Sequence, residues 1–267
     1  MKMKAFLFII SFLTIQGCTH TSNMLPPQIQ TKHLQHPLTY HKQTENFEEE
    51  FSNNEISIPT NDPLSGYNTF MTSFNDGFIS YVLNPISKGY GYVLPEPLRI
   101  GISNAYKNIQ FPVRFANNIL QGKWKSSVEE VERFILNSTL GLAGLLDIST
   151  YQFHIPKHEE DFGQTLAYYG IGSGFPIVLP FLGPSNARDL VGLTVDAYAS
   201  PLVNVRGLDN YKIPNNFGQS TAIIAGYLIN QKSLELGQYE SLKKDALELY
   251  PFLQDIYEQK RTADIAE

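Results

Sequence analysis

The spacing of apolar side chains predicts an amphipathic helix that begins near Asp62. Asp62 is a good N-cap and Pro63 suits the first helical position. Apolar residues then recur at steps of three and four, at Leu64, Tyr67, Met71, Phe74, Phe78 and Tyr81. The opposite face is polar but uncharged, and it includes Asn68. The pattern favours an ordinary helix whose apolar stripe packs into a core. The alternative is a helix whose neutral face lines a confined, wet space.

Similar patterns predict several further helices. Ser127 with Glu130 forms a capping-box pattern before a helix in which Val128, Val131, Phe134, Ile135 and Ser138 share a face. Further helical segments are predicted at 112–122, at 215–231 and in the tail from Ser241, where Pro251 predicts a kink. Because convincing period-two alternation is absent, the pattern predicts a mainly α body.

One long segment is unusual because it has no charged residue. The sequence "FGQTLAYYGIGSGFPIVLPFLGPSNA" (162–187) contains no Asp, Glu, Lys or Arg, but five glycines and three prolines. It is too apolar for an exposed loop and too interrupted for a membrane-spanning helix. Irregular backbone is tolerated at membrane depth where it is buried in protein or lines a water-filled cavity. The segment therefore fits either the wall of a pore or a buried core loop.

The N-terminus has the layout of an exported protein. Residues 1–17 combine a basic start with a short apolar run, which is typical of a signal peptide. The run ends in Ile15-Gln16-Gly17-Cys18, which resembles the lipobox of bacterial lipoproteins, and Cys18 is the only cysteine. We therefore expect Cys18 to be lipidated. Thr19 follows it instead of Asp, which indicates an outer-membrane address. Residues 18–61 are polar and predict a disordered tether, followed by a folded body at 62–267.

Composition and motifs argue against several other functions. The net charge of −6 and the scattered basic residues exclude a nucleic-acid surface. The glycines of 170–174 lack the spacing of a nucleotide-binding loop. Ser185 has no later histidine to complete a lipase-like triad. His154 and His158 lie beside acidic residues, but a solvated loop is favoured over a metal site. We therefore expect no enzyme activity, no cofactor and no metal.

Several stretches resemble the MlaA/VacJ family of bacterial outer-membrane lipoproteins. They are "DPLSGYNTFMTSFND" (62–76), residues 81–123, "RFILNSTLGLAGLLDI" (133–148), residues 160–189 and, more weakly, "YPFLQDIYEQKR" (250–261). Together they extend over nearly the whole body in the expected order. Two departures are the long tether and Gln254, where the family commonly has an arginine.

The resemblance implies an all-α, ring-like helical body with a central amphipathic channel, preceded by a disordered, lipid-anchored tether. Such a body lies in the inner leaflet of the outer membrane, on its periplasmic side. It removes mislocalised phospholipids from the outer leaflet and passes them to a periplasmic phospholipid carrier protein, which maintains lipid asymmetry. The implied partners are phospholipids, trimeric porins and that carrier, with no nucleic acid. The alternative is a scaffolding lipoprotein that binds porins without conducting lipid.

If the channel is present, the neutral helix face and the charge-free segment supply the candidates for its wall. The candidate lipid-path residues are Asn68, Gly170, Gly172, Gly174, Pro176, Pro180 and Gly183. Among these, Gly172 and Gly174 are favoured because a glycine does not narrow the path with a side chain.

Overall fold

The structure is a computed structural model that describes residues 62–205 and 211–266. The chain divides into two compact units, residues 1–51 and 52–267, and all described residues belong to the second. The signal peptide, Cys18 and the predicted tether lie outside the described residues.

The described part of the chain is helical except for one short hairpin, which confirms the predicted mainly α body. Its first helices are α2 (Ser65–Phe78), the π-helical η1 (Ile79–Leu83), α3 (Asn84–Val93), α4 (Glu96–Ile109), α5 (Phe111–Leu120), α6 (Trp124–Thr139), α7 (Ile148–Tyr151) and α8 (Phe162–Tyr168). Strands β1 (Pro176–Leu179) and β2 (Gly183–Asn186) follow, and then α9 (Ala187–Ala199), α10 (Phe217–Leu234), α11 (Gln238–Asp245) and α12 (Leu249–Ala266).

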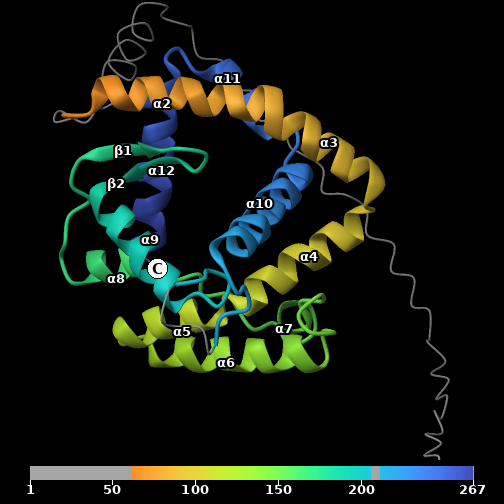
Figure 1. The fold of residues 1–267 in the computed structure, drawn as a ribbon. Helices are drawn as coiled ribbons and strands as arrows, with labels where there is room; N and C mark the ends of the chain where they lie inside the picture. Colours follow the sequence, from red (N-terminus) through yellow and green to blue (C-terminus); the bar gives the residue numbers. More distant parts are fainter. Residues whose placement is uncertain (1–61, 206–210, 267) are drawn as a thin grey trace, which may run out of the picture. The chain divides into compact units, whose positions relative to one another are not determined.

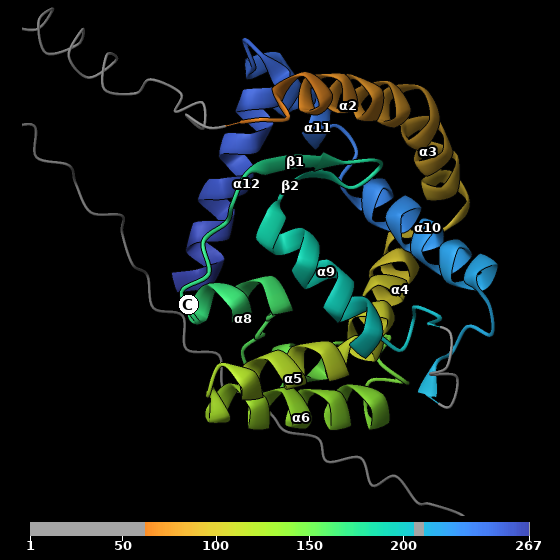
Figure 2. The same ribbon diagram turned by 60° about the vertical axis from the view of Figure 1, so that its left-hand side comes forward.

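Within this unit the elements form a closed circuit of contacts (Figures 1 and 2). The chain runs from α2 through η1, α3 and α4 to α5, and α5 packs on α6, α8 and α9. The hairpin connects α9 back to α2, because β2 contacts α9 and β1 contacts α2. α10 packs on α3 and α4, while α12 contacts α2, α8 and β2 and so joins the last helix to the first.

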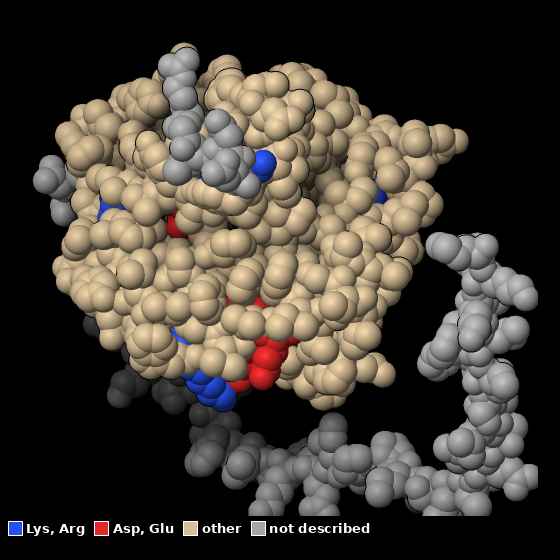
Figure 3. Space-filling model, turned by 60° about the horizontal axis from the view of Figure 1, so that its bottom comes forward, with Lys and Arg blue, Asp and Glu red and all other residues tan. Residues whose placement is uncertain are grey.

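The described residues distribute polar and apolar side chains in an inverted way. Among the described residues, the buried apolar side chains of the core are Val113, Val178 and Leu202, whereas the buried polar side chains are far more numerous. Many Phe, Tyr, Leu and Ile side chains are exposed instead. On the face in Figure 3, most of the surface is neither acidic nor basic. An exposed apolar surface of this extent is typical of a protein that contacts membrane or other protein.

The first helix shows this inversion and corrects two predictions. α2 begins at Ser65 and its N-cap is Leu64, so the predicted N-cap at Asp62 is wrong. The Asp62 carboxylate instead accepts hydrogen bonds from Leu64 N and Asn68 Nδ2. No member of the predicted core stripe is buried: Phe74 and Tyr81 are exposed, and Phe78 is half-buried. The buried residues of the helix are Asn68, Thr72 and Asn75. The prediction that the apolar stripe packs into a core is therefore wrong, since hydrophobic periodicity alone does not say which face is buried.

Helix α6 is inverted in the same way. It starts at Trp124, so Ser127 and Glu130 lie within the helix and the predicted capping box is wrong. Ser127 Oγ donates to the Lys123 carbonyl. The buried side chains are Ser127, Glu130, Arg133 and Asn137, whereas Val128 and Ile135 are exposed.

The charge-free segment contains helix α8, a connecting loop and the antiparallel β1–β2 hairpin. Val178 pairs with Pro184, and Leu179 with Gly183 across the turn. Helix α8 starts with a capping box between Asp161 and Gln164. Glycine and proline residues thus serve a compact hairpin here, which sequence periodicity did not predict.

The tail forms two helices separated by a break at residues 246–248. Pro251 lies in the first turn of α12, so it does not produce the predicted kink. Gln254 is buried and its amide donates to the carbonyl of Ser185 in β2. The tail therefore contacts the hairpin through β2, whereas α2 contacts it mainly through β1. In the described part of the chain, none of the helices has the length and apolar character needed to cross a bilayer.

Candidate functional site: two adjoining cavities

Two cavities adjoin inside the circuit of helices. The smaller, of about 460 Å³, is lined by Phe78, Val82, Leu83, Ile86, Pro180, Phe181, Leu182, Phe217, Thr221, Ile224, Ala225, Leu228 and Ile229. The larger, of about 640 Å³, is lined by residues of α4, α5, α9 and α10, together with 159–161 and Leu182. Leu182, Ile224 and Leu228 line both cavities. These three side chains therefore form the junction.

Helix α10 is the common wall, and its sequence explains how it can be so. Its polar side is fixed against α3 and α4: Tyr90 donates to Asn230 Oδ1, and Asn230 Nδ2 donates to the Arg99 carbonyl. Asn216 caps the helix by accepting from Gln219 N. With its polar groups bonded on one side, the helix presents Ile224 and Leu228 to the cavities.

The hairpin turn closes the smaller cavity. Phe181 has a positive φ of 65°, a conformation that non-glycine residues adopt only at a cost. Its ring packs edge-to-face on Phe74 and Phe78, with ring centroids 5.4 and 4.8 Å away. These contacts, and the hydrogen bond from Phe181 N to Asn75 Oδ1, hold the turn in this conformation.

The larger cavity differs because one end of it is charged. The charged residues that line it are Lys107, Arg114, Glu159, Glu160, Asp161 and Asp196. Lys107 Nζ pairs with Glu159 Oε1 at 2.9 Å, and both side chains are substantially exposed. Burial alone would raise the pKa of Glu159, but the hydrogen bond and charge of Lys107 outweigh it and hold that pKa below its ordinary value. The cavity system is thus apolar at one end and polar at the other.

Asp196 is the most perturbed acid in this cavity. Burial raises the pKa of Asp196 to about 6, although hydrogen bonds from Phe162 N and Asn117 Nδ2 favour its ionised form. None of the described Lys, Arg or His side chains forms an ion pair with it. A wall of the same cavity carries Tyr106 and Tyr227, stacked at 3.6 Å. Burial raises the pKa of Tyr227 to about 12, so both rings face the cavity uncharged.

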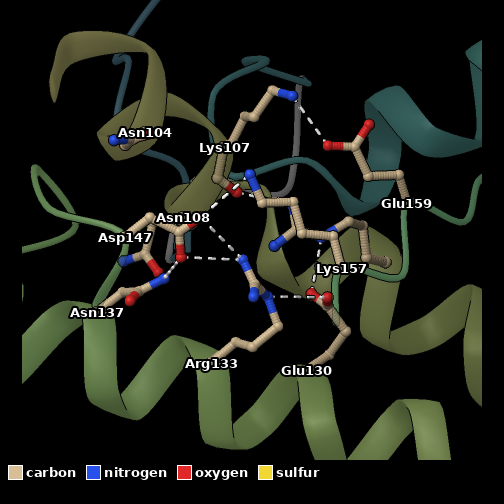
Figure 4. Close-up of a pocket in the computed structure, with 10 residues that line it drawn as sticks. Asn104, Lys107, Asn108, Glu130, Arg133, Asn137, Asp147, Lys157 and Glu159 are labelled. Atoms are coloured by element: carbon tan, nitrogen blue, oxygen red, sulfur yellow. Dashed lines mark hydrogen bonds and ion pairs between the residues drawn. The ribbon is translucent and has the colours of Figure 1, made fainter. Parts of the chain in front are cut away.

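A small polar pocket of about 30 Å³ lies beside the charged end (Figure 4). Lys107, Arg114 and Glu159 line both this pocket and the larger cavity. In the pocket Glu130 lies between two arginines, with its carboxylate 2.7 Å from Arg114 Nε and 3.6 Å from Arg133 Nε. Such a pocket has room for about one water molecule. The ion pairs of Glu130 hold Arg114, which lines both spaces.

The structure brings few of the predicted lipid-path residues to the cavities. Of Asn68, Gly170, Gly172, Gly174, Pro176, Pro180 and Gly183, Pro180 alone lines one. Asn68 is fully buried, and its amide donates to the Pro176 carbonyl and accepts from Val178 N. Gly170, Gly172 and Gly174 are exposed in the loop before β1, Pro176 is buried in β1, and Gly183 is half-buried at the turn.

The histidine pair is also separated. His154 Nδ1 lies 3.2 Å from the Thr150 carbonyl, whereas His158 Nε2 lies 2.6 Å from Glu129 Oε2. Among residues 62–205 and 211–266, no group of three or more His, Cys, Asp or Glu side chains is placed to bind a metal ion.

Sequence reasoning missed the residues that do line the cavities. Ile224 and Leu228 lie in a helix whose apolar residues occur on all sides, so periodicity did not single them out. Asp196 gave a usable signal, because it is an isolated acid in the apolar run "LVGLTVDAYA" (190–199). A lone carboxylate in such a run is expensive to bury and often functional.

Three comparisons place this chain among known proteins. A family model described as "MlaA lipoprotein" matches residues 60–264. The chain is 27% identical to an uncharacterized protein of Rickettsia felis over 205 residues, 76% of this chain and 78% of that one. It is 34% identical over 139 residues to the "Intermembrane phospholipid transport system lipoprotein MlaA" of Haemophilus influenzae, a match that covers 51% of this chain and about half, 56%, of the relative.

A solved structure is similar in fold as well as sequence. It carries the name "Structural basis for maintenance of bacterial outer membrane lipid asymmetry". Its TM-score is 0.65 at 27% identity, and the alignment covers 77% of this chain and 99% of that one. The similarity therefore extends over the whole of the solved chain.

Proposed function

This chain belongs to the MlaA lipoprotein family, and on that premise we propose that it conducts phospholipids through its paired cavities. In this proposal it removes mislocalised phospholipids from the outer leaflet of the outer membrane and passes them to a periplasmic carrier. The named relatives are intermembrane phospholipid transport lipoproteins, which supports this reading. Transport proceeds by selective passage, without catalysis.

The observation that carries the proposal is the polarity of the cavity system. A phospholipid has two apolar chains and a charged headgroup, and the two cavities offer matching surroundings. The smaller cavity is lined almost entirely by apolar side chains, whereas the larger ends at Lys107, Glu159 and Asp196. A lipid that crosses the junction keeps its chains against Ile224 and Leu228 while its headgroup stays near charged groups.

The exposed apolar surface supports a location at the membrane. Apolar side chains on the outside and bonded polar side chains on the inside suit a body embedded in one leaflet. We propose that the protein lies on the periplasmic side of the outer membrane and is anchored through lipidated Cys18. Because one acyl chain binds membranes only marginally, we expect a multiply acylated terminus.

Two kinds of protein partner follow from the family resemblance. A soluble periplasmic carrier would accept the lipid, and trimeric porins would bind the exposed apolar surface in the membrane. The rival function is a scaffold that binds porins without conducting lipid. The rival gives no role to cavities with one apolar and one charged end, and for this reason we prefer transport.

The test is a substitution at the junction of the cavities. Ile224→Trp fills the space that both cavities share and should block lipid passage. Ala222→Trp is the matched control, because Ala222 is exposed on the same helix and lines neither cavity. Each variant would complement a deletion strain, with outer-leaflet phospholipid measured by labelling of intact cells and protein level by immunoblot.

We expect phospholipid to accumulate in the outer leaflet with Ile224→Trp but not with Ala222→Trp, at equal protein levels. Normal asymmetry in the Ile224→Trp strain would contradict conduction through the junction. Normal asymmetry in the deletion strain itself would favour the scaffold.

The anchor has a separate test. Cys18→Ser should abolish acylation and remove the protein from the outer-membrane fraction. Mass spectrometry of the purified protein would detect the lipid. If Cys18→Ser still carried covalent lipid, the assignment of the anchor would be wrong.

A further inference from the structure

We infer that the charged end of the larger cavity recognises a zwitterionic phospholipid headgroup, with its ammonium group against Asp196 and its phosphate against Lys107. This inference rests on the proposed function, because it names the class of lipid that the same cavity admits. The chemistry recognised is an ammonium group beside a phosphodiester, as in an ethanolamine phospholipid.

Three charged residues that line the larger cavity, Arg114, Glu160 and Asp161, form ion pairs with residues outside it. Glu130 pairs with Arg114 at 2.7 Å. Lys123 pairs with Glu160 at 2.6 Å, and Arg261 pairs with Asp161 at 2.6 Å. The partners Glu130, Lys123 and Arg261 do not line the cavity, so these three charges are already neutralised.

Of the four acids that line the cavity, Asp196 is the one that forms no ion pair with a described residue, because Glu159 pairs with Lys107. Its two carboxylate oxygens are oriented by Asn117 Nδ2 and by the backbone N–H of Phe162, each at 3.0 Å. Its neighbours that also line the cavity are Leu193 and Ala197 on α9 and Ser200 just after it, none of which can neutralise it. A partly buried carboxylate in such surroundings is stabilised by a cation. An ammonium group of the ligand would supply that charge and donate hydrogen bonds to it.

Lys107 is the cation that can turn to a ligand. Arg114 cannot, because its Nε donates to Glu130 and its Nη1 donates to the Lys107 carbonyl at 2.7 Å. The Lys107–Glu159 pair is exposed, and such pairs are weak. Lys107 can therefore exchange Glu159 for a phosphate at little cost.

Both groups line the same cavity, and contacts along α5 connect them. Arg114 contacts the backbone of Lys107, and Asn117, which donates to Asp196, lies one helical turn beyond Arg114 on α5. The phosphate and ammonium groups of a single headgroup can thus meet Lys107 and Asp196 across one wall of the cavity.

The same charges disfavour an anionic headgroup. Phosphatidylglycerol carries the phosphate but no ammonium group, so Asp196 would stay unneutralised and would repel this lipid. The cavity therefore discriminates by headgroup charge, and it should prefer phosphatidylethanolamine over phosphatidylglycerol.

The experiment measures this preference directly. The purified full-length protein is equilibrated with vesicles of equimolar phosphatidylethanolamine and phosphatidylglycerol, recovered, and its retained lipids are quantified by mass spectrometry. We expect the wild type to retain about threefold or more ethanolamine over glycerol lipid. Asp196→Asn should bring that ratio close to one, because the ethanolamine lipid loses the charge that its ammonium group contacts. Glu132→Gln, an exposed carboxylate outside both cavities, should retain the wild-type ratio.

A wild-type ratio near one would overturn the inference, and so would an unchanged preference in Asp196→Asn. Both results would leave the proposed transport intact, whereas a wild type that retained no lipid would overturn the proposed function itself. Soluble glycerophosphoethanolamine should not displace the retained lipid at equal concentration. Displacement would identify the ligand as a free headgroup and overturn the assignment to lipid. The wild-type ratio tests the inference even if the Asp196 variant does not fold.

Discussion

Asn68 and Asn75, two turns apart on α2, each form two hydrogen bonds with the backbone of the same hairpin, one donated and one accepted by the side-chain amide. Asn68 donates to the Pro176 carbonyl at 3.1 Å and accepts from Val178 N at 2.8 Å. Asn75 repeats the arrangement, donating to the Leu179 carbonyl and accepting from Phe181 N. Seven residues of helix rise by about 10.5 Å, and three residues of strand by about 10 Å. The two amides therefore match the hairpin in register and take the place of a neighbouring strand.

The first prediction concerns the hydrogen bonds between Asn68 and the hairpin. Asn68→Ala would leave the Val178 N–H and the Pro176 carbonyl without those partners inside the protein. We expect it to lower the free energy of unfolding by about 2–4 kcal/mol. Ser73→Ala, on the exposed side of the same helix, should change it by less than about 0.5 kcal/mol. Denaturant unfolding in detergent would measure both, and a loss below about 1 kcal/mol for Asn68→Ala would contradict the role given to the amide.

The second prediction concerns acid stability. Arg261 of α12 contacts Asp161 and Asp189, joining the last helix to α8 and α9. Burial alone would raise the pKa of Asp189, but hydrogen bonds from Arg188, Arg261 and Tyr257, with the charge of Arg261, lower it to about 2. Because this pKa lies below that of the unfolded chain, the stabilisation is present above about pH 4 and is lost as pH falls towards 2.

Asp189→Asn should therefore lower Tm at pH 7 by roughly 5 °C or more, with little difference from the wild type near pH 2. Thermal unfolding followed by circular dichroism would test this. A Tm difference that stayed constant from pH 7 to pH 2 would show that the charge of Asp189 is not responsible.

The third prediction has the opposite sign. The pKa of Asp196 is raised to about 6 by burial, so the folded state holds a proton that the unfolded chain releases between about pH 4 and pH 6. Stability contributed by this group is therefore present below about pH 4 and is lost as pH rises to 6. Asp196→Asn should raise Tm at pH 7.5 and leave it nearly unchanged at pH 4. A lower Tm at pH 7.5 would mean that the carboxylate is neutralised in the empty protein.

The fourth prediction separates the two glycines that the sequence favoured for the channel wall. Gly172 has open space where a Cβ would lie, so Gly172→Ala should be nearly neutral in stability. Gly174 has a φ of +74°, and a Cβ there would lie 3.0 Å from that of Ala187. Gly174→Ala should lower the free energy of unfolding by about 1–2 kcal/mol. Equal effects in denaturant unfolding would contradict this local geometry.

The sequence by itself predicted a mainly α body, several of its helices and the family to which it belongs. Local rules were sufficient for α5 and α10, because the spacing of their residues and an N-cap such as Asn216 act within a few residues of chain. The family could be identified for a similar reason, since glycine, proline and asparagine recur at fixed positions from Asp62 onward. The same information indicated an apolar, irregular segment at 162–187.

Tertiary structure decided which face of each helix is buried and which residues meet the cavities. Periodicity distinguishes two faces but does not say which is buried, so it predicts a buried Phe74 although that side chain is exposed. The face of Asn68 is buried because the hairpin, more than a hundred residues away in the chain, supplies the backbone groups that its amide bonds. Asp196 likewise acquires its environment from α5 and from the residues before α8. Partners so distant in sequence leave no local periodic signal, because the free energy that selects them arises only when the chain has folded.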